Sequence, residues 1–400
     1  MSVTGKPFLP ELLRALVAKL RYAVVGAGGI GRHHAEVASR LEEYEFVAVA
    51  DVVEERAKEL ASRFNARAYT NYVEMLEKEQ VDVISVCTPH PTHAEIAIEA
   101  VKRGVNVLTE KPMAATVSQC LAMIGEARKR GVKLGVVFQN RFEPRVRKAK
   151  GMINRGEMGD IYRAMLRYVT YRDMAYFLSG AWRGKWATEG GGVLINQAVH
   201  YIDLFLWLLG RRPREVFAYA ATAGHDIEVE DLVSAAAVFE GGCQGVMQFS
   251  TLDYPDMTNI ELRGDKAMLL VETSPKRSEQ GLRNETSVFV YRNAPPIRRA
   301  VYASLKPGAP RAAFTIEEVK AEEPFTGHEA VLRDFARAVL EDREPEVPGE
   351  EGLKSVELIN AIIMSAVEHR PVEIPFDPAR YDELLKRLEK LGGPPWPPLR

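Results

Sequence analysis

The alternation of short β-rich runs with helical patterns between Tyr22 and Asn140 most constrains the fold of this chain. The β-rich runs are YAVVG, FVAVAD, VDVISVCTP, VNVLTEKP and KLGVVFQN, and the helical patterns between them begin near Arg32, Glu54, Thr92 and Val117. Strands that alternate with helices form βαβ units, in which the strands lie parallel. The pattern predicts a doubly wound parallel sheet of about six strands, with ligands at the carboxyl ends of the strands.

A glycine motif follows the first predicted strand. Gly26, Gly28 and Gly31 form G-x-G-x-x-G directly before a predicted helix. In a Rossmann domain these glycines permit a tight turn, close approach of a pyrophosphate and close helix packing. Asp51 ends the second predicted strand, where its carboxylate can accept both ribose hydroxyls and would repel a 2′-phosphate. The motif predicts a site for NAD in preference to NADP, although Arg56 lies nearby in the sequence.

The regular alternation of predicted strands and helices ends after Arg141. A helix over 144–154, a long strand over 160–172 and a helix over 193–209 precede several β-rich runs separated by turns, and two more helices follow over 328–341 and 352–368. Runs joined by tight turns form hairpins, so a second α+β domain with a large, mostly antiparallel open sheet is predicted. The expected parts are an N-terminal helical extension (1–20), a Rossmann domain (21–141), a substrate-binding and oligomerisation domain (142–375) and a C-terminal tail (376–400).

Composition narrows the possible partners. The chain has 53 basic and 55 acidic residues without long blocks of one sign, which argues against a nucleic-acid partner and favours a small molecule. Cys87, Cys120 and Cys243 follow no CxxC or Cys/His spacing, so neither a disulfide framework nor a metal site is expected, and a reducing cytoplasm fits. Charged residues interrupt the apolar stretch 8–20, and no membrane-spanning segment is expected.

Two segments carry residues suited to chemistry. Lys111 lies where the strand predicted for VNVLTEKP ends, at the mouth of the crevice, although a solvated lysine in a turn is an equal alternative. A run of three glycines, 190–192, precedes an apolar helix in which Asn196 and His200 share one face. The alternative for His200 is a core histidine. Asp203, almost one turn further along, either orients His200 or ties the helix to the sheet.

Three motifs, in this order, resemble those of the Gfo/Idh/MocA family of oxidoreductases: GAGGIGRHHA, VISVCTPHPTHAEIAIEAVKRGVNVLTEKPMA and GGGVLINQAVHYIDLFLWLLG. The resemblance covers residues 21–372 and implies that Lys111 and His200 flank the reacting carbon beside the nicotinamide. A histidine with a pKa near neutrality would take the hydroxyl proton, and Lys111 would stabilise the developing alkoxide. Many relatives have aspartate where this chain has Asn196, and an amide can orient a partner but cannot act as a base.

The resemblance also implies the rest of the site. Cofactor contacts are expected from Gly26, Gly28, Gly29, Ile30, Gly31, Asp51, Thr88, Pro89, His90, His93, Glu110, Lys111, Gln139, Trp182 and Arg183. Substrate contacts are expected from Lys111, Asn140, Arg141, Trp182, Arg183, Asn196, Gln197, His200 and Tyr254. A cis peptide between Lys111 and Pro112 is expected as well.

The favoured function is reversible, NAD-dependent oxidation of a secondary hydroxyl of a sugar, cyclitol or sugar derivative, with nucleotide sugars among the candidates. Two alternatives keep the fold. One is an NAD-requiring glycosidase without net redox change, and the other is a non-catalytic sensor of NAD or sugar, against which the presence of Lys111 and His200 argues. A homodimer or homotetramer is expected through the C-terminal sheet, whose second face is partly apolar.

Overall fold

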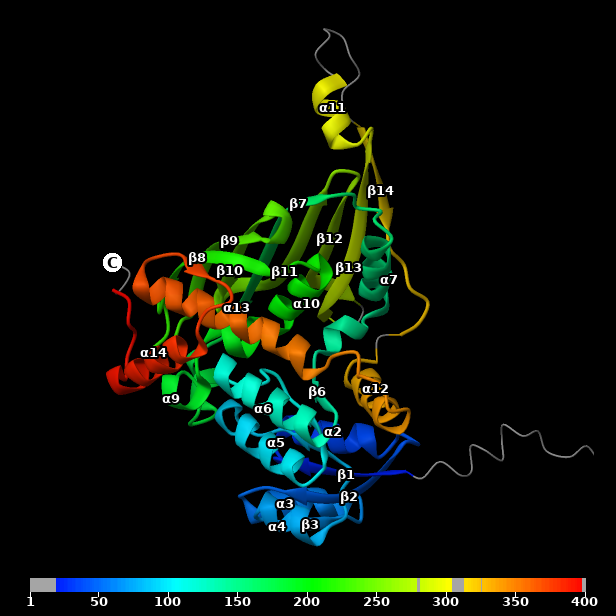
Figure 1. Ribbon diagram of the computed structural model, residues 1–400, viewed down its shortest axis with the longest axis vertical. Helices are drawn as coiled ribbons and strands as arrows, with labels where there is room; N and C mark the ends of the chain where they lie inside the picture. The colour runs from blue at the N-terminus through cyan, green and yellow to red at the C-terminus, as the bar shows by residue number, and fades with distance from the viewer. Residues whose placement is uncertain (1–18, 279–280, 304–312, 325, 398–400) are drawn as a thin grey trace, which may run out of the picture.

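The computed structural model describes residues 19–278, 281–303, 313–324 and 326–397, and it contains two β-sheets with helices around and between them (Figure 1). The sheet of the N-terminal third lies at one end of the molecule and the larger sheet at the other. The predicted helix over 8–20 lies outside the described residues except at its end, where Leu20 already begins the first strand.

The first sheet confirms the predicted doubly wound domain. Its six strands lie parallel in the order β3-β2-β1-β4-β5-β6, so the strand order reverses between β1 and β4. A ligand crevice is expected where the order reverses, at the carboxyl ends of these strands. The strands are β1 (Leu20–Val25), β2 (Tyr44–Ala50), β3 (Arg67–Tyr69), β4 (Val83–Val86), β5 (Asn106–Thr109) and β6 (Leu134–Val136). The helices between them are α2 (Gly29–Ala38), α3 (Glu54–Arg63), α4 (Tyr72–Lys78), α5 (His93–Lys102) and α6 (Val117–Arg130), with a 3₁₀ turn, η1 (His90–Thr92), before α5.

The second sheet confirms the predicted large and mostly antiparallel sheet. Its nine strands follow the order β14-β13-β12-β11-β7-β10-β9-β8-β15, and β7 and β10 form the parallel pair. Burial alternates along β9 as expected for a strand with one covered face. The strands are β7 (Ile161–Tyr171), β8 (Pro213–Ala221), β9 (Leu232–Phe239), β10 (Gln244–Ser250), β11 (Leu252–Gly264), β12 (Ala267–Ser278), β13 (Gly281–Ala294), β14 (Ala313–Glu318) and β15 (Val372–Glu373).

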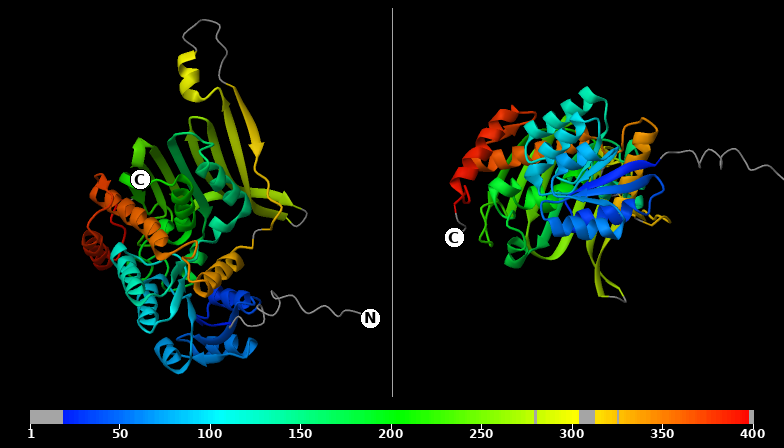
Figure 2. Two further views of the ribbon diagram at one scale, coloured as in Figure 1. Left: turned by 45° about the vertical axis from the view of Figure 1, so that its right-hand side comes forward. Right: turned by 90° about the horizontal axis from the view of Figure 1, so that it is seen from below.

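One face of the second sheet is covered by three helices, α7 (Pro144–Asn154), α10 (Val199–Leu209) and α13 (Gly349–Glu368) (Figure 2). Long strands carry α11 (Ile297–Ala303) away from the body of the molecule (Figure 1). The remaining elements are η2 (Gln139–Phe142), α8 (Met174–Leu178), α9 (Trp186–Glu189), the π-helical turn η3 (Leu194–Ala198), η4 (Glu240–Gly242), α12 (His328–Leu340) and α14 (Pro378–Leu391).

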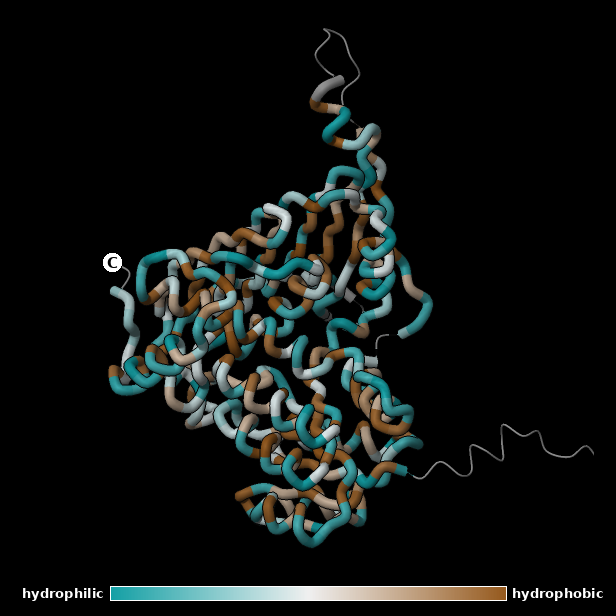
Figure 3. The backbone as a smooth tube through the Cα atoms, viewed as in Figure 1, coloured by the Kyte–Doolittle hydropathy of each residue, from teal (hydrophilic) through white to brown (hydrophobic). Residues whose placement is uncertain are grey.

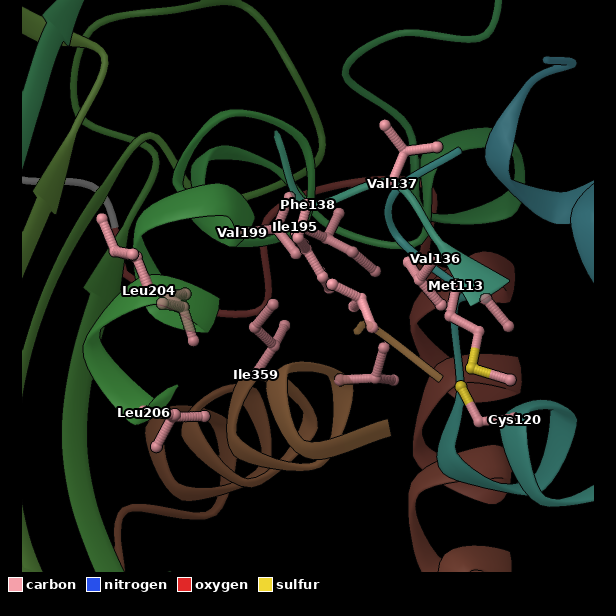
Figure 4. Packing of buried hydrophobic residues seen from close by; sticks show 14 of the residues in the cluster. Met113, Cys120, Val136, Val137, Phe138, Ile195, Val199, Leu204, Leu206 and Ile359 are labelled. Atoms are coloured by element: carbon pink, nitrogen blue, oxygen red, sulfur yellow. The ribbon is translucent and has the colours of Figure 1, made fainter. Parts of the chain in front are cut away.

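A continuous hydrophobic core joins the two sheets. Apolar residues of β6, α10 and α13 meet there, among them Val136, Val199 and Ile359 (Figure 4). Hydrophobic and hydrophilic stretches alternate along the chain in both domains (Figure 3). Gly352 lets α13 approach β6, because a Cβ there would lie 2.5 Å from Val136 Cγ2. The two sheets are therefore joined by firmly packed elements.

The expected C-terminal tail contains a helix. It begins with α14, whose buried residues Tyr381, Leu384, Leu385 and Leu388 have the spacing of one helical face. Asp377 caps this helix by accepting a hydrogen bond from Ala379 N. Further along, Trp396 is 7% exposed and donates a hydrogen bond from Nε1 to Thr222 Oγ1 at 3.0 Å. The tail thus belongs to the folded domain.

One described segment, Trp186–Leu209, has the length and composition of a membrane span, contrary to the expectation that no segment would reach that length. Its most apolar window is 83% buried inside the protein, as in a helix of a hydrophobic core.

Candidate active site

A cavity of about 930 Å³ opens at the carboxyl ends of the parallel strands and reaches the helices of the second domain. It confirms the predicted position of the crevice. The predicted residues that line it are Gly26, Gly28, Gly29, Ile30, Asp51, Thr88, Pro89, His90, His93, Glu110, Lys111, Gln139, Trp182, Arg183, Asn196 and His200. Residues from both domains therefore meet around one space.

The glycine loop fits the pyrophosphate of a dinucleotide. Nothing lies within 4 Å of where a Cβ would be at Gly28, so the backbone is open to a ligand. At Gly31 a Cβ would lie 1.8 Å from Gly26 O, which shows why the helix can begin so close to the strand only with glycine. Asp51 holds the loop with Oδ2, which accepts a hydrogen bond from Ala27 N at 2.7 Å, and it also lines the cavity. Its carboxylate can still accept ribose hydroxyls with its free lone pairs.

Lys111 projects toward the second domain from the loop after β5, and its peptide bond to Pro112 is cis, as expected. Lys111 Nζ donates a hydrogen bond to the backbone oxygen of Asn196 at 2.9 Å. That oxygen belongs to the π-helical turn η3, and such turns often occur at functional sites. Burial lowers the pKa of Lys111, while Glu110 opposes this shift. The ammonium group has donors left for a ligand in the cavity.

The three glycines before η3 confirm the expected close backbone approach. Gly190 and Gly191 have φ of +82° and +151°, which side chains rarely adopt. At Gly192 a Cβ would lie 1.9 Å from Glu230 O. Glu230 Oε1 accepts hydrogen bonds from Gly192 N at 2.8 Å and Leu194 N at 3.2 Å. Glu230 therefore fixes the start of the helix that carries Asn196 and His200.

His200 faces the cavity, which favours the active-site alternative over a core histidine. Its Nδ1 is buried and has no hydrogen-bond partner among the described residues. Burial, followed by the positive charge of Lys111, lowers the pKa of His200 to about 3. The expected pKa near neutrality is therefore wrong for the free protein. The imidazole is neutral at pH 7 and able to accept a proton.

Glu110 anchors a buried hydrogen-bond network beside Lys111. Its Oε1 lies 3.0 Å from His34 Nε2 and 3.6 Å from His328 Nε2. His34 Nδ1 lies 3.0 Å from Ser85 Oγ. Burial alone would raise the pKa of Glu110, but hydrogen bonds from His328 and His34 hold it well below its usual range. These three side chains also lie close enough together to be considered as metal ligands, but the hydrogen bonds already account for their arrangement.

Trp182 and Arg183 reach back to the Rossmann crevice, as the resemblance implied. The Trp182 ring lies 5.1 Å from the ring of His90, edge to face. The Arg183 guanidinium lies 4.3 Å from the Trp182 ring centre and 4.2 Å from that of Tyr176. Arg183 makes no ion pair with a carboxylate within 4.0 Å in the described part of the chain. A cation held between two rings and open to the cavity is suited to binding an anion.

Arg141 was predicted to contact substrate, and this is wrong. Its side chain is buried and forms hydrogen bonds from Nε and Nη2 to Asp203, at 2.8 and 2.6 Å. Its Nη1 also lies 3.0 Å from Glu351 Oε2. Asp203 therefore does not orient His200, and its carboxylate ties α10 to the 3₁₀ turn η2 instead of to the sheet.

Four other predicted residues do not line the cavity. Gly31 supports the loop through packing alone, and Asn140 lies outside the cavity wall. Gln197 is buried and donates a hydrogen bond from Nε2 to Tyr176 Oη at 3.1 Å. Tyr254 is 77% exposed on the second sheet, with its ring near Tyr171.

Several residues near the site were not identified from the sequence, and three of them contact predicted residues. These are Glu189, Tyr176 and His328, of which His328 lines the cavity. The one available signal for Glu189 was its position directly before the glycine run. For Tyr176 and His328 the sequence holds no pattern that separates them from ordinary surface residues.

Comparison with known proteins identifies the fold and chemistry. Residues 20–138 match the model of an oxidoreductase family with an NAD-binding Rossmann fold, named GFO_IDH_MocA, and residues 146–270 match the C-terminal domain model of the same family. The chain belongs to the Gfo/Idh/MocA family of oxidoreductases. Its N-terminal domain is accordingly an NAD-binding Rossmann domain, as the glycine motif predicted.

Relatives in this family act on sugars and cyclitols. The chain is 26% identical to the myo-inositol 2-dehydrogenase of Thermotoga maritima, over 89% of this chain and 98% of the relative. It is 32% identical to the D-glucoside 3-dehydrogenase of Escherichia coli, over 48% and 54% of the two chains. The WlbA dehydrogenase from Bordetella pertussis, solved with NADH and UDP-GlcNAcA, is 29% identical with a TM-score of 0.75, over 90% of this chain and all of the other.

Proposed function

We propose that this oxidoreductase oxidises a secondary hydroxyl of a sugar or sugar derivative, with NAD as the hydride acceptor. The observation that carries the proposal is the position of Lys111 Nζ, held at 2.9 Å from Asn196 O in the same cavity as His200 and the glycine loop. A substrate carbon placed between these side chains would face the nicotinamide end of the crevice. The family relatives that act on sugars support the substrate class.

Lys111 and His200 have different roles in the proposed reaction, since Lys111 stabilises negative charge and His200 accepts a proton. NAD, when bound, accepts the hydride that leaves the carbinol carbon. Lys111 donates a hydrogen bond to the substrate oxygen and stabilises negative charge that develops there. His200 is neutral and lines the cavity, so its imidazole can accept the hydroxyl proton. Its low basicity suffices because the oxygen becomes a far weaker base as the carbonyl forms.

An acidic sugar is the substrate class that the charges favour. Lys111 and Arg183 both face the cavity, and Glu110, the carboxylate beside Lys111, is already engaged by His34 and His328. A carboxylate on the substrate would supply the counterion that Arg183 lacks among the described residues. The relative solved with UDP-GlcNAcA, a nucleotide sugar with a carboxylate, supports this proposal.

The test begins with native mass spectrometry of the purified protein, which detects retained NAD and metabolites. A panel of sugars, cyclitols and nucleotide sugars is then scored by nicotinamide absorbance, with UDP-GlcNAcA and UDP-GlcNAc as a matched pair. Net NADH formation supports a dehydrogenase. Release of an aglycone without net NADH would instead show the glycosidase, and binding without turnover would show a sensor.

The role of Arg183 is tested within the same panel. Arg183→Met keeps an unbranched side chain between the two rings but removes the charge. We expect it to lower kcat/KM for the acidic substrate by about 10- to 100-fold, as for loss of a charged hydrogen bond, and to spare the neutral one. Equal losses on both members of the pair would refute the acidic-substrate proposal.

A further inference from the structure

The mechanism leaves one buried carboxyl group beside the site unused. Glu189 ends α9, directly before the glycine run, and is 1% exposed. Its Oε2 accepts a hydrogen bond from Gly184 N at 2.5 Å, and its Oε1 accepts one from Asn196 Nδ2. Glu189 does not line the cavity, whereas Asn196 does. It can therefore act on a substrate only through Asn196.

The contacts of Asn196 determine which amide atom faces the cavity. Asn196 Nδ2 also lies 3.3 Å from Tyr176 Oη, but that oxygen accepts shorter hydrogen bonds from Arg183 Nη1 and Gln197 Nε2, so the firm acceptor of the NH₂ group is Glu189 Oε1. Within the described ranges Asn196 Oδ1 has no hydrogen-bond partner. The amide orientation follows from this network, because a carboxylate can only accept and must therefore be matched with the NH₂ group.

We propose that Glu189 is a positioning residue that fixes the Asn196 amide with its oxygen toward the cavity, so that this oxygen accepts a hydrogen bond from a second hydroxyl of the sugar. The inference rests on the proposed function and deepens it. Lys111 donates to the oxygen that is oxidised, and Asn196 accepts from a hydroxyl that keeps its proton. The site would thus select a diol over a sugar with an isolated hydroxyl.

Protonation of Glu189 would reverse this arrangement. A protonated carboxyl at Oε1 can donate to Asn196 Oδ1, which would turn the NH₂ group toward the cavity and remove the acceptor. Burial raises the pKa of Glu189 to about 7, against the opposing effects of the hydrogen bonds from Gly184 and Asn196 and of the charges of Arg183 and Lys111. Substrate affinity should therefore fall as pH decreases through about 7.

Other titratable groups surround Glu189, so the effects of their titration must be distinguished from those of Glu189. Those that face it or its short helix are Lys111, Arg183, Tyr176, His90, Glu228 and Glu230. Burial also raises the pKa of Glu230 to about 7, so this residue is the necessary control. Its carboxylate contacts backbone N–H groups and not Asn196.

The first experiment needs no substrate. Protein labelled with ¹⁵N-asparagine is titrated in the NAD complex, and the side-chain signals of Asn196 are assigned by their loss in Asn196→Ala. We expect these signals to shift with a midpoint near pH 7, to become independent of pH in Glu189→Gln, and to titrate still in Glu230→Gln. Signals in the wild type that do not move through this range would overturn the coupling, whether or not the protein oxidises sugars.

The second experiment uses the sugar that the panel identifies. Glu189→Gln should raise KM about 3- to 10-fold at high pH, the loss of one hydrogen bond of ordinary strength, and should abolish the rise in KM toward low pH. Its kcat and NAD affinity should change little. An analogue with a methyl ether at the second hydroxyl should show no further loss in the variant. A variant with the KM and pH profile of the wild type would overturn the proposal.

Discussion

In the proposed reaction Lys111 is the residue on which the chemistry most depends, and its ammonium group reaches from the Rossmann domain to the backbone oxygen of Asn196 at 2.9 Å. Lys111→Ala should lower kcat by about 10²-fold or more, because it removes the donor that stabilises the developing alkoxide. NAD affinity should remain, because the glycine loop and Asp51 are unchanged. Steady-state kinetics beside an NAD titration measures both, with the exposed Lys129→Ala as the control. A parallel loss of NAD affinity would show that Lys111 mainly builds the cofactor site.

The low pKa of His200 determines the pH dependence that we expect for kcat. His200→Ala should lower kcat by about 10²-fold or more through loss of the proton acceptor, while the profile near pH 7 keeps its shape. With a pKa of about 3, the imidazole is uncharged around pH 7. It becomes protonated, and unable to accept a proton, only as the pH falls to about 3, so activity that depends on His200 should be lost only there. If His200→Ala instead abolishes a titration near neutrality, the free-protein pKa described above does not apply to the substrate complex.

At the scale of single elements, the start of the helix at η3 is held by close backbone contact. Gly192→Ala would place a Cβ 1.9 Å from Glu230 O and should displace Asn196 and His200 together. We expect most activity to be lost while NAD still binds. Gly125→Ala in α6 is the matched control, because nothing lies within 4 Å of its Cβ position and alanine favours the helix by about 1 kcal/mol. Full activity in Gly192→Ala would show that this contact can relax.

The ion pair between Arg141 and Asp203 links η2 to α10. Asp203→Leu leaves the buried guanidinium with Glu351 as its carboxylate partner and Trp207 as a ring contact, and breaking such a buried pair costs about 3–5 kcal/mol. The melting temperature should fall clearly. Arg141→Met combined with Asp203→Leu should recover most of the loss, because two apolar side chains then fill the space. A double variant as unstable as the single one would show that packing volume, and not charge, decides stability here.

The sequence predicted those parts of the site that depend on local pattern. The glycine loop, the position of Lys111 after β5 and the glycine run before Asn196 follow from backbone geometry that neighbouring residues dictate. The pairing of Arg141 with Asp203 joins residues 62 positions apart, so no periodicity could reveal it. The pKa values of His200 and Glu189 depend on burial by several elements. The face of α14 was visible in its spacing, but the prolines around it concealed the helix.

At the scale of the whole molecule, we propose that the large sheet pairs with a second copy of the chain. Helices cover one of its faces, and on the strands Val246 is 48% exposed, Val238 41% and Tyr219 63%. A partly apolar open surface of this kind favours association through a closed, symmetric interface. Light scattering at micromolar concentration should give the mass of a dimer or tetramer, and Val246→Glu should shift it toward the monomer. A monomer mass for the unaltered protein would refute the proposal.

The central claim is that hydride passes from a sugar carbon to NAD in the cavity between the domains. The most direct measurement is stopped-flow nicotinamide absorbance after the NAD complex is mixed with the acidic sugar that the panel selects, for the wild type and Lys111→Ala. We predict that NADH forms and accumulates in the wild type, and that its formation is about 10²-fold or more slower in the variant, which binds NAD equally well. Equal rates in the two proteins, or NADH that forms and is consumed without a ketone product, would contradict the account.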